Sequence, residues 1–349
     1  MYRNTKANIY LNNIKYNVKT IIQKYNDYKY YIGVVKADSY GHNSYEVVKA
    51  IIDGGCNYLA VSSLDEAIEI RKYSNIPILC LGIINSKYID ICEQNNIDVT
   101  VTNLEYLKDI KNYNINIHIK IDTGMNRLGV KEKDEFNLMI KEIKNSNLKL
   151  KGIFTHIYEA TNKENTNKQI DKFKEITSDI DLNKIDMVHI AQSDTLLNHP
   201  KIDFCNSCRL GIIMYGLTTN NLNLKNTIEL ISEIIEIKHL KKGDTVSYNG
   251  TYKAINNELI GIVSIGYADG VNRHLKGSYV YINDKKYEIV GNICMDMLMV
   301  KIDESVKIND KVYIYKDINH IEELSKYLDT IPYELICNIS KRVPRIYIK

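Results

Sequence analysis

The sequence predicts an α/β protein: a (β/α)8 barrel of the TIM type followed by a mostly β C-terminal domain. Between residues 30 and 216, short apolar runs rich in β-branched residues alternate with longer mixed segments that have helical spacing. Most of these runs are apolar on both faces, which is typical of parallel strands covered on both sides. After about residue 228 the pattern changes to strand-like runs separated by Gly, Asn and Asp turns.

The barrel prediction depends on the number of apolar runs. Eight runs alternating with helical segments favour a closed barrel over its rival, a doubly wound open sheet. Helical spacing is clearest over residues 63–74, 133–146 and 165–180, the first of which has acidic residues in its first turn. The expected strands are 30–36, 58–62, 77–82, 98–101, 115–122, 150–156, 186–191 and 209–216.

The boundary between the two domains is expected near residue 228. Residues 9–227 are assigned to the barrel, and residues 228–349 together with 1–8 to the β domain. Within the β domain, "INDKK" at 282–286 predicts a hairpin, and residues 320–328 predict a short helix. Residues 291–300 are expected to form an apolar strand interrupted by Asp296.

Composition excludes several classes of function. Lys+Arg (46) and Asp+Glu (43) nearly balance and no long basic run occurs, which argues against a nucleic-acid partner. No segment approaches the ~18 apolar residues of a membrane span, and the N-terminal stretch lacks the apolar core of a signal peptide. The seven scattered cysteines suit a reducing cytoplasm. "CNSC" at 205–208 is a lone C-x-x-C, so no metal site is expected.

Several residues that could act in catalysis or binding lie at or near the ends of predicted barrel strands. Active sites of parallel barrels are built at the carboxyl ends of their strands. Lys36 ends the first run, His156 the sixth, Ser193 follows the seventh and Arg209 begins the eighth. A desolvated Lys36 could act as a nucleophile toward an aldehyde, or its amine could simply reach to the rim; spacing alone leaves both open.

Other candidates are individually weak. Arg127, in "KIDTGMNRLGV", could hold an anionic oxygen or belong to a surface loop. Ser193 could offer its hydroxyl to a phosphate, and the bare backbone of Gly211 could approach one closely. Tyr267, after Gly266, could exchange a proton or simply pack. Core filling is the ordinary explanation for Met295.

Six motifs in one order across nearly the whole chain carry a family resemblance. They are "VVKADSYGH", "KIDTGMNRLG", "RLGIIMYG", "SIGYADG", "GNICMDM" and "ISKRVPRIY". Together they resemble those of bacterial alanine racemases, pyridoxal-phosphate enzymes with a barrel domain and a β domain that work as homodimers. The resemblance implies a cytoplasmic isomerase that interconverts L-alanine and D-alanine and supplies D-alanine for peptidoglycan.

The resemblance also implies roles for individual residues. Lys36 is expected to bind pyridoxal phosphate covalently, and Arg209 to face its pyridine nitrogen with His156 alongside. Arg127 is expected near the substrate carboxylate, steadied by Lys120, a position often carbamylated in the family. The residues implied to bind the cofactor are Lys36, Tyr40, His156, Ser193, Arg209, Gly211 and Ile212.

Racemisation is expected to use two bases, because the Cα proton leaves one face and returns to the other. Lys36 would serve one face. By the resemblance, Tyr267 of the second subunit would serve the opposite face, and Met295 and Asp296 of that subunit would line the substrate end. The resemblance therefore implies an active site completed across an interface, which would make the homodimer functionally necessary.

Three departures from the family pattern keep an alternative open. Lys341 stands where a tyrosine is usual, Gln192 and Asp194 stand in "HIAQSDT", and the stretch after His156 is unusually polar. The last two changes are similar to those of serine racemases of the same fold, so a serine or broad-specificity racemase is the alternative. A non-catalytic carrier of pyridoxal phosphate would need neither "SIGYADG" nor "GNICMDM". A decarboxylase would want an acid in place of Arg209.

Overall fold

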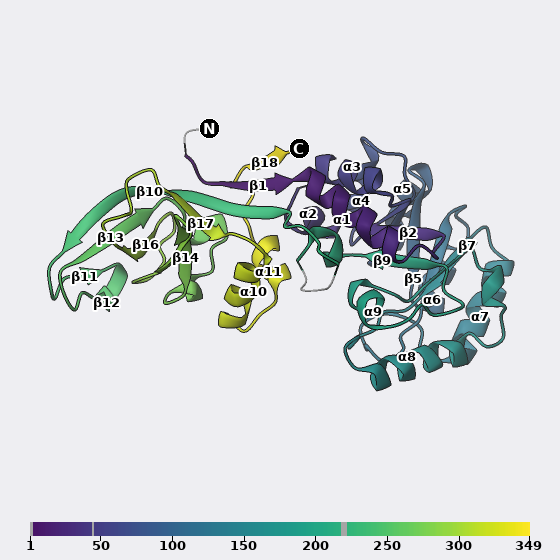
Figure 1. Cartoon of the computed structure of the whole chain (residues 1–349). Coiled ribbons are helices and arrows are strands. Elements are labelled where there is room, and N and C mark those ends of the chain that lie inside the picture. Colours follow the sequence, from purple (N-terminus) through teal and green to yellow (C-terminus); the bar gives the residue numbers. More distant parts are fainter. Residues whose placement is uncertain (1–2, 44, 218–221) are drawn as a thin grey trace. The chain divides into compact units, whose positions relative to one another are not determined.

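The computed structural model describes residues 3–43, 45–217 and 222–349 (Figure 1). Its contacts divide the chain into two compact units. The barrel unit comprises Lys15–Ser39 and Val47–Met214, and the β unit comprises Met1–Ile14, Tyr40–Glu46 and Tyr215–Lys349. Within the described ranges, no helix is both long and apolar enough to cross a membrane.

The barrel unit contains a closed ring of parallel strands, which confirms the predicted fold class (Figure 1). Each strand pairs with the next, and β2 pairs with β9 to close the ring. Each of the eight predicted apolar runs overlaps one of these strands. They are β2 (Tyr30–Val34), β3 (Tyr58–Val61), β4 (Ile78–Cys80), β5 (Ile97–Val101), β6 (Asn116–Lys120), β7 (Lys149–Phe154), β8 (Met187–His189) and β9 (Ser207–Leu210).

Helices alternate with these strands, and side-chain caps start several of them. Ser63 accepts a hydrogen bond from the backbone N–H of Glu66, and Asn103 accepts one from that of Tyr106. The three predicted helical segments are confirmed as α4, α7 and α8. The helices are α1 (Leu11–Lys24), α3 (Tyr45–Gly54), α4 (Leu64–Arg71), α5 (Ile89–Gln94), α6 (Leu104–Ile110), α7 (Lys133–Lys144), α8 (Lys163–Ile176) and α9 (Ser193–Asn198).

The eighth predicted strand, 209–216, is wrong beyond its first two residues. β9 ends at Leu210, and Ile212–Tyr215 form the 3-10 turn η3. The Ser193 hydroxyl explains the break, because it accepts the backbone N–H groups of Gly211 (3.1 Å) and Ile213 (3.5 Å). Those N–H groups are therefore not available to a sheet ladder.

The β unit is built around the long strand β10 (Ile228–Leu240). Its main sheet has the order β15-β14-β17-β10-β1-β18, and β13 pairs with both β10 and β16. The chain ends meet there, because β1 runs parallel to β18. The remaining strands are β1 (Lys6–Tyr10), β11 (Thr245–Val246), β12 (Tyr252–Lys253), β13 (Glu258–Val263), β14 (Tyr279–Ile282), β15 (Lys285–Glu288), β16 (Leu298–Ile302), β17 (Lys311–Tyr315) and β18 (Arg345–Ile348).

The predicted hairpin and the predicted helix of the β unit are both confirmed. Asn283 and Asp284, with φ of 48° and 62°, form the two-residue turn between β14 and β15. Helix α10 (Ile318–Tyr327) covers the predicted helical segment. Helix α11 (Pro332–Cys337) was not predicted, although proline at its first position is a recognised start signal.

The predicted strand over residues 291–300 is wrong in its first part. β16 begins at Leu298, and the preceding residues form a loop. The backbone N–H of Cys294 donates to Met297 O (2.8 Å), which folds the loop into a tight turn. The carbonyls of Cys294 and Met295 accept the N–H groups of Tyr267 and Ala268 (3.0 Å each). The loop before β16 and the loop that carries Tyr267 are therefore joined by backbone hydrogen bonds.

Gly270 and Gly243 have nearly equal φ but different surroundings. Comparing alanine at the two positions therefore distinguishes the cost of backbone strain from the cost of close packing. Gly270 (φ 101°) leaves a Cβ only 2.1 Å from Asn338 O, whereas Gly243 (φ 99°) has nothing within 4 Å. Alanine at either position bears a left-handed conformation costing about 1 kcal/mol. Gly270→Ala should lower the free energy of unfolding by about 2 kcal/mol more than Gly243→Ala, because only Gly270→Ala also displaces backbone. Equal shifts in the urea midpoint would contradict this.

Candidate active site

Lys36 opens a strained turn directly after the first barrel strand. It begins the short segment α2 (Lys36–Tyr40), two residues after β2 ends. Ala37, Asp38 and Ser39 have φ of 52–53°, a left-handed conformation costing roughly 1–2 kcal/mol per residue. The Glu66 carboxylate accepts the backbone N–H of Ala37 at 2.6 Å and so helps to hold the turn. Backbone strain of this kind clusters at functional sites.

Lys36 belongs to a group of basic side chains near the carboxyl ends of the strands. Burial lowers the pKa of Lys120 to about 8, assisted by the positive charges of Arg127, Arg209 and Lys36. Burial also lowers the pKa of His156 to about 3, with the same charges contributing. His156 is therefore neutral at physiological pH, while the cations around it create a field that attracts an anionic ligand.

Arg209, on β9, is almost completely buried and tightly fixed. Its Nη1 donates to His189 Nδ1 (2.7 Å) and His189 O (2.8 Å), and its Nη2 donates to Thr155 O (2.8 Å) and Ile190 O (3.0 Å). These four bonds use four of the five N–H donors of a guanidinium. Burial lowers the pKa of Arg209 to about 10, so it remains charged at neutral pH.

The Ser193 hydroxyl gathers backbone donors at one point. Ser193 begins α9, and its oxygen accepts the N–H groups of Gly211 and Ile213. Converging backbone N–H groups of this kind suit a phosphate. Gln192, one of the departures from the family pattern, caps α9 by accepting the N–H of Asp194 at 2.8 Å. The structure thus gives that departure a local role.

A short loop after β6 carries Arg127. The Asp122 carboxylate accepts the backbone N–H groups of Gly124 and Asn126 at 3.0 Å each, which shapes the loop. A small cleft here is lined by Lys120, Ile121, Asp122, Met125, Arg127, Leu128, Thr155 and His156. Sequence reasoning missed the contribution of Thr155, which acts through its backbone carbonyl and leaves no sequence signal.

The β unit holds the remaining predicted residues. Tyr267 (41% exposed) and Met295 (53% exposed) lie on the joined loops described above, and Asp296 pairs with Arg342 at 2.7 Å. The Tyr40 ring lies 5.0 Å from that of Tyr215 and 5.9 Å from that of Tyr333. The structure therefore divides the predicted residues between the two units. Those of the barrel unit are Lys36, Lys120, Arg127, His156, Ser193, Arg209, Gly211 and Ile212.

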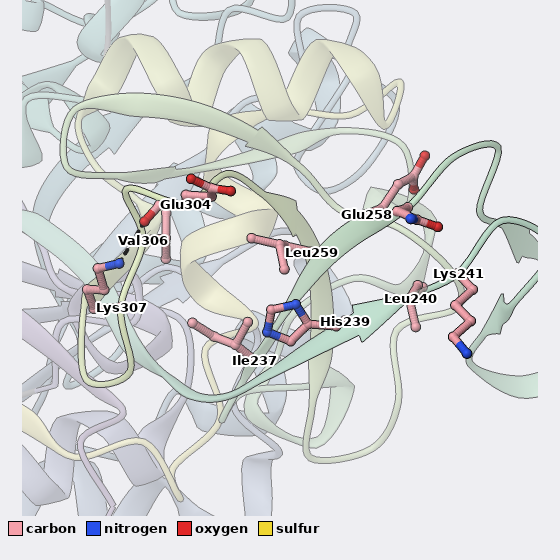
Figure 2. A pocket seen from close by; sticks show the side chains of 10 residues that line it. Ile237, His239, Leu240, Lys241, Glu258, Leu259, Glu304, Val306 and Lys307 are labelled. Atoms are coloured by element: carbon pink, nitrogen blue, oxygen red, sulfur yellow. Dashed lines mark hydrogen bonds between the residues drawn. The ribbon is translucent and has the colours of Figure 1, made fainter.

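A groove of about 710 Å³ in the β unit involves none of the predicted site residues (Figure 2). Ile237, His239 and Leu240 of β10 line it, with Glu258, Leu259 and the loop before β17. The close-up shows aliphatic side chains together with an imidazole, carboxylates and lysines. This groove has no catalytic arrangement comparable to the basic group of the barrel.

Comparison with known proteins decides the family. Residues 9–219 match the family model "Alanine racemase, N-terminal domain", and residues 227–347 match "Alanine racemase, C-terminal domain". The chain belongs to the alanine racemase family. It is 38% identical over 367 residues to alanine racemase 1 of Bacillus subtilis, an alignment covering 100% of this chain and 94% of that protein.

Solved structures of alanine racemases have the same fold. The Bacillus anthracis enzyme with bound L-Ala-P is 33% identical with a TM-score of 0.93, covering 100% of this chain and 96% of the other. Alanine racemase from E. faecalis is 34% identical with a TM-score of 0.94, covering 99% of both chains. A histidine racemase from Leuconostoc mesenteroides, at 23% identity and a TM-score of 0.90, shares the fold.

The lowered pKa of Lys120 predicts a pH-dependent stability. Below about pH 8 both the folded and the unfolded chain carry this proton, and the folded state bears the cost of a buried charge. Between about pH 8 and 10.5 the folded chain releases the proton while the unfolded chain retains it. The free energy of unfolding should therefore gain about 3 kcal/mol from this residue as the pH rises.

Urea unfolding at a series of pH values tests this, with Lys120→Met compared with the parent chain. The Lys120→Met variant should lack this gain in the free energy of unfolding. Lys131→Met is the control, because Lys131 is exposed, and it should retain the gain. Identical pH profiles for Lys120→Met and the parent would show that the Lys120 amine is not perturbed.

Proposed function

We propose that this protein is a pyridoxal-phosphate-dependent alanine racemase that interconverts L-alanine and D-alanine by a two-base mechanism. The observation that carries the proposal is the group of Lys36, Lys120, Arg127 and Arg209 around a neutral His156, in a chain of the alanine racemase family. D-alanine for peptidoglycan is the proposed product. The cytoplasm is the proposed location, supported by the seven free cysteines among the described residues.

The donor set of the barrel fits pyridoxal phosphate. Lys36 would bind the cofactor covalently, Tyr40 and Ser193 with the backbone of Gly211 and Ile212 would hold its phosphate, and His156 would lie beside its ring. In the described residues, the Nε–H of Arg209 is the one donor of that side chain with no protein acceptor, and it would meet the ring nitrogen. When bound, the cofactor withdraws electrons from the α-carbon of an attached amino acid and so acidifies its proton.

Arg209 would control how strongly that electron withdrawal acts. Its pKa of about 10 means that Arg209 keeps its proton at neutral pH, so it would donate a hydrogen bond to the ring nitrogen without protonating it. An unprotonated ring is a weaker electron sink, which restrains side reactions such as transamination. A decarboxylase or transaminase would need an acid here.

Two residues would handle the Cα proton. The Lys36 amine accepts or returns it on one face, and the Tyr267 hydroxyl does so on the other. We propose that Tyr267 comes from the second subunit of a homodimer. Its exposure, and that of Met295 and Met297 on the adjoining loop, supports this, because large exposed apolar side chains close together favour a partner.

The substrate carboxylate would meet Arg127 of one subunit, and Met295 and Asp296 of the second subunit. Arg127 offers charge, the Met295 backbone offers an N–H, and Asp296 with Arg342 fixes the loop. A neutral Lys120 amine can add carbon dioxide, forming an N–C bond and releasing a proton; the resulting carbamate would hold Arg127.

We also propose the domain division 9–227 and 228–349 with 1–8; the two family-model matches support it.

Chiral analysis of amino acids tests the proposed activity. With added pyridoxal phosphate the protein should convert L-alanine to D-alanine. Lys36→Ala should lose the visible absorbance of bound cofactor and at least ~10³-fold in rate, because no other amine replaces the nucleophile and base. Lys131→Ala is the matched control and should retain both. Turnover of serine but not alanine would move the assignment to the alternative, serine racemase.

Tyr267→Phe tests the two-base scheme through deuterium exchange at Cα. Without the phenol, one face loses its base while Lys36 still serves the other. In D2O, deuterium should enter one enantiomer of alanine at least ~10-fold faster than the other, with little inversion. Tyr248→Phe, at another exposed tyrosine of the β unit, should leave exchange unchanged. Equal residual exchange of L- and D-alanine would rule out two separate bases.

A further inference from the structure

A line of buried polar side chains crosses the barrel interior from Arg209 to Asp98. Arg209 Nη1 lies 2.7 Å from His189 Nδ1, and His189 Nε2 lies 3.1 Å from His118 Nδ1. His118 Nε2 then lies 3.4 Å from Asp98 Oδ2. Both imidazoles are completely buried. We call these four side chains the Arg209–Asp98 relay.

The relay is tightly packed as well as polar. The ring of His189 stacks on Phe154 with centroids 4.5 Å apart. Gly152 on β7 leaves room for His118, since a Cβ there would lie 2.2 Å from His118 Nδ1. The two rings therefore have little freedom to turn.

The donors and acceptors allow one arrangement of protons along the relay. A guanidinium only donates, so His189 Nδ1 accepts and the proton of that neutral ring is on Nε2. His189 Nε2–H then donates to His118 Nδ1, which must also be an unprotonated acceptor. The proton of His118 is consequently on Nε2, facing Asp98. Every N–H thus points from the arginine toward the carboxylate.

Asp98 is held as an anion at the far end of the relay. Burial alone would raise the pKa of Asp98, but His118, Tyr58 and Asn116 together hold it below its usual value. Tyr58 donates its hydroxyl to Asp98 Oδ2, and Asn116 Nδ2 donates to Oδ1 at 3.0 Å. Asp98, Tyr58 and Asn116 also line a cavity of about 270 Å³ near the amino ends of the strands.

Arg209 carries a buried positive charge, and the relay connects it to a buried carboxylate. Each hydrogen bond that Arg209 makes among the described residues goes to a neutral acceptor: three carbonyl oxygens and one imidazole nitrogen. A buried cation is costly without a compensating anion. Asp98 is the carboxylate at the far end of this line of contacts, with its Oδ2 atom 3.4 Å from His118 Nε2. Polar groups aligned in a buried network polarise one another, so the two rings can carry the effect of that charge toward Arg209.

We propose that Asp98 is a remote positioning residue for Arg209, acting through His118 and His189 from the opposite end of the barrel. The negative charge of Asp98 keeps both imidazoles in the Nε2–H form. His189 Nδ1 thereby always accepts from Arg209, and the guanidinium keeps its remaining Nε–H directed to the site. The catalytic part of this inference rests on the proposed function, whereas the proton arrangement does not.

Imidazole ¹⁵N spectra of the full chain, with and without bound pyridoxal phosphate, test the proton arrangement. In the parent chain, His118 and His189 should each show a pyridine-type Nδ1 and a protonated Nε2. Asp98→Asn should shift the nitrogens of both rings, because the anionic end of the relay is gone. Asp186→Asn is the matched control. That carboxylate also pairs with a tyrosine, Tyr30, but is not hydrogen-bonded to either histidine.

Steady-state kinetics with alanine test the catalytic consequence. Asp98→Asn should lower kcat by about fivefold and leave KM for alanine unchanged, because Asp98 touches no substrate. Asp186→Asn should leave both parameters unchanged. If Asp98→Asn does not fold, Tyr58→Phe, which removes only one hydrogen bond to the carboxylate, should shift the same ring nitrogens in the same direction by a smaller amount.

Several results would overturn the inference. A protonated Nδ1 on either ring in the parent chain would contradict the direction of the relay. Ring nitrogens unmoved in both Asp98→Asn and Tyr58→Phe, or moved equally in Asp186→Asn, would show that Asp98 is not coupled to Arg209. A chain without racemase activity would remove the proposed function while the spectra still decide the relay.

Discussion

The buried positive charge of Arg209 is the constraint on which the site depends. Four of its donors end on protein acceptors, and its guanidinium lies 5.4 Å from the ring of Phe154. A cation fixed in this way cannot move away from its neighbours. Its charge therefore contributes to keeping His156 neutral and to lowering the pKa of Lys120. Burial is the first cause of both shifts, and the fixed guanidinium adds to it together with Arg127 and Lys36.

The architecture assigns different tasks to rigid and to adaptable elements. Strands hold Lys120 and Arg209, whose charges must stay in place, because a barrel strand is hydrogen-bonded on both sides. Turns hold Lys36, Arg127 and Tyr267, the residues that we propose reach a ligand. The left-handed conformation after Lys36 is costly, and the hydrogen bond from the Ala37 N–H to Glu66 helps to maintain it.

Much of the fold was predictable because strand and helix periodicities differ so strongly. The alternation of apolar runs with helical segments located every barrel strand, and a two-residue Asn-Asp turn located the hairpin after β14. The errors have a common cause. The predicted strands beyond Leu210 and before Leu298 are apolar in sequence, but the Ser193 hydroxyl and the turn at Cys294 divert their backbone N–H groups from a ladder. Apolar composition reports burial and says nothing about where each N–H donates.

The sequence by itself determined the barrel followed by a β domain and, through six ordered motifs, the family; it also predicted the candidate site residues. Only the tertiary structure decided how those residues act on one another. Asp98, His118, His189 and Arg209 lie on four strands spread over more than a hundred positions, and no local pattern joins them. Closure of a parallel barrel turns alternate side chains of distant strands into one interior, where burial and proximity fix charge and proton position.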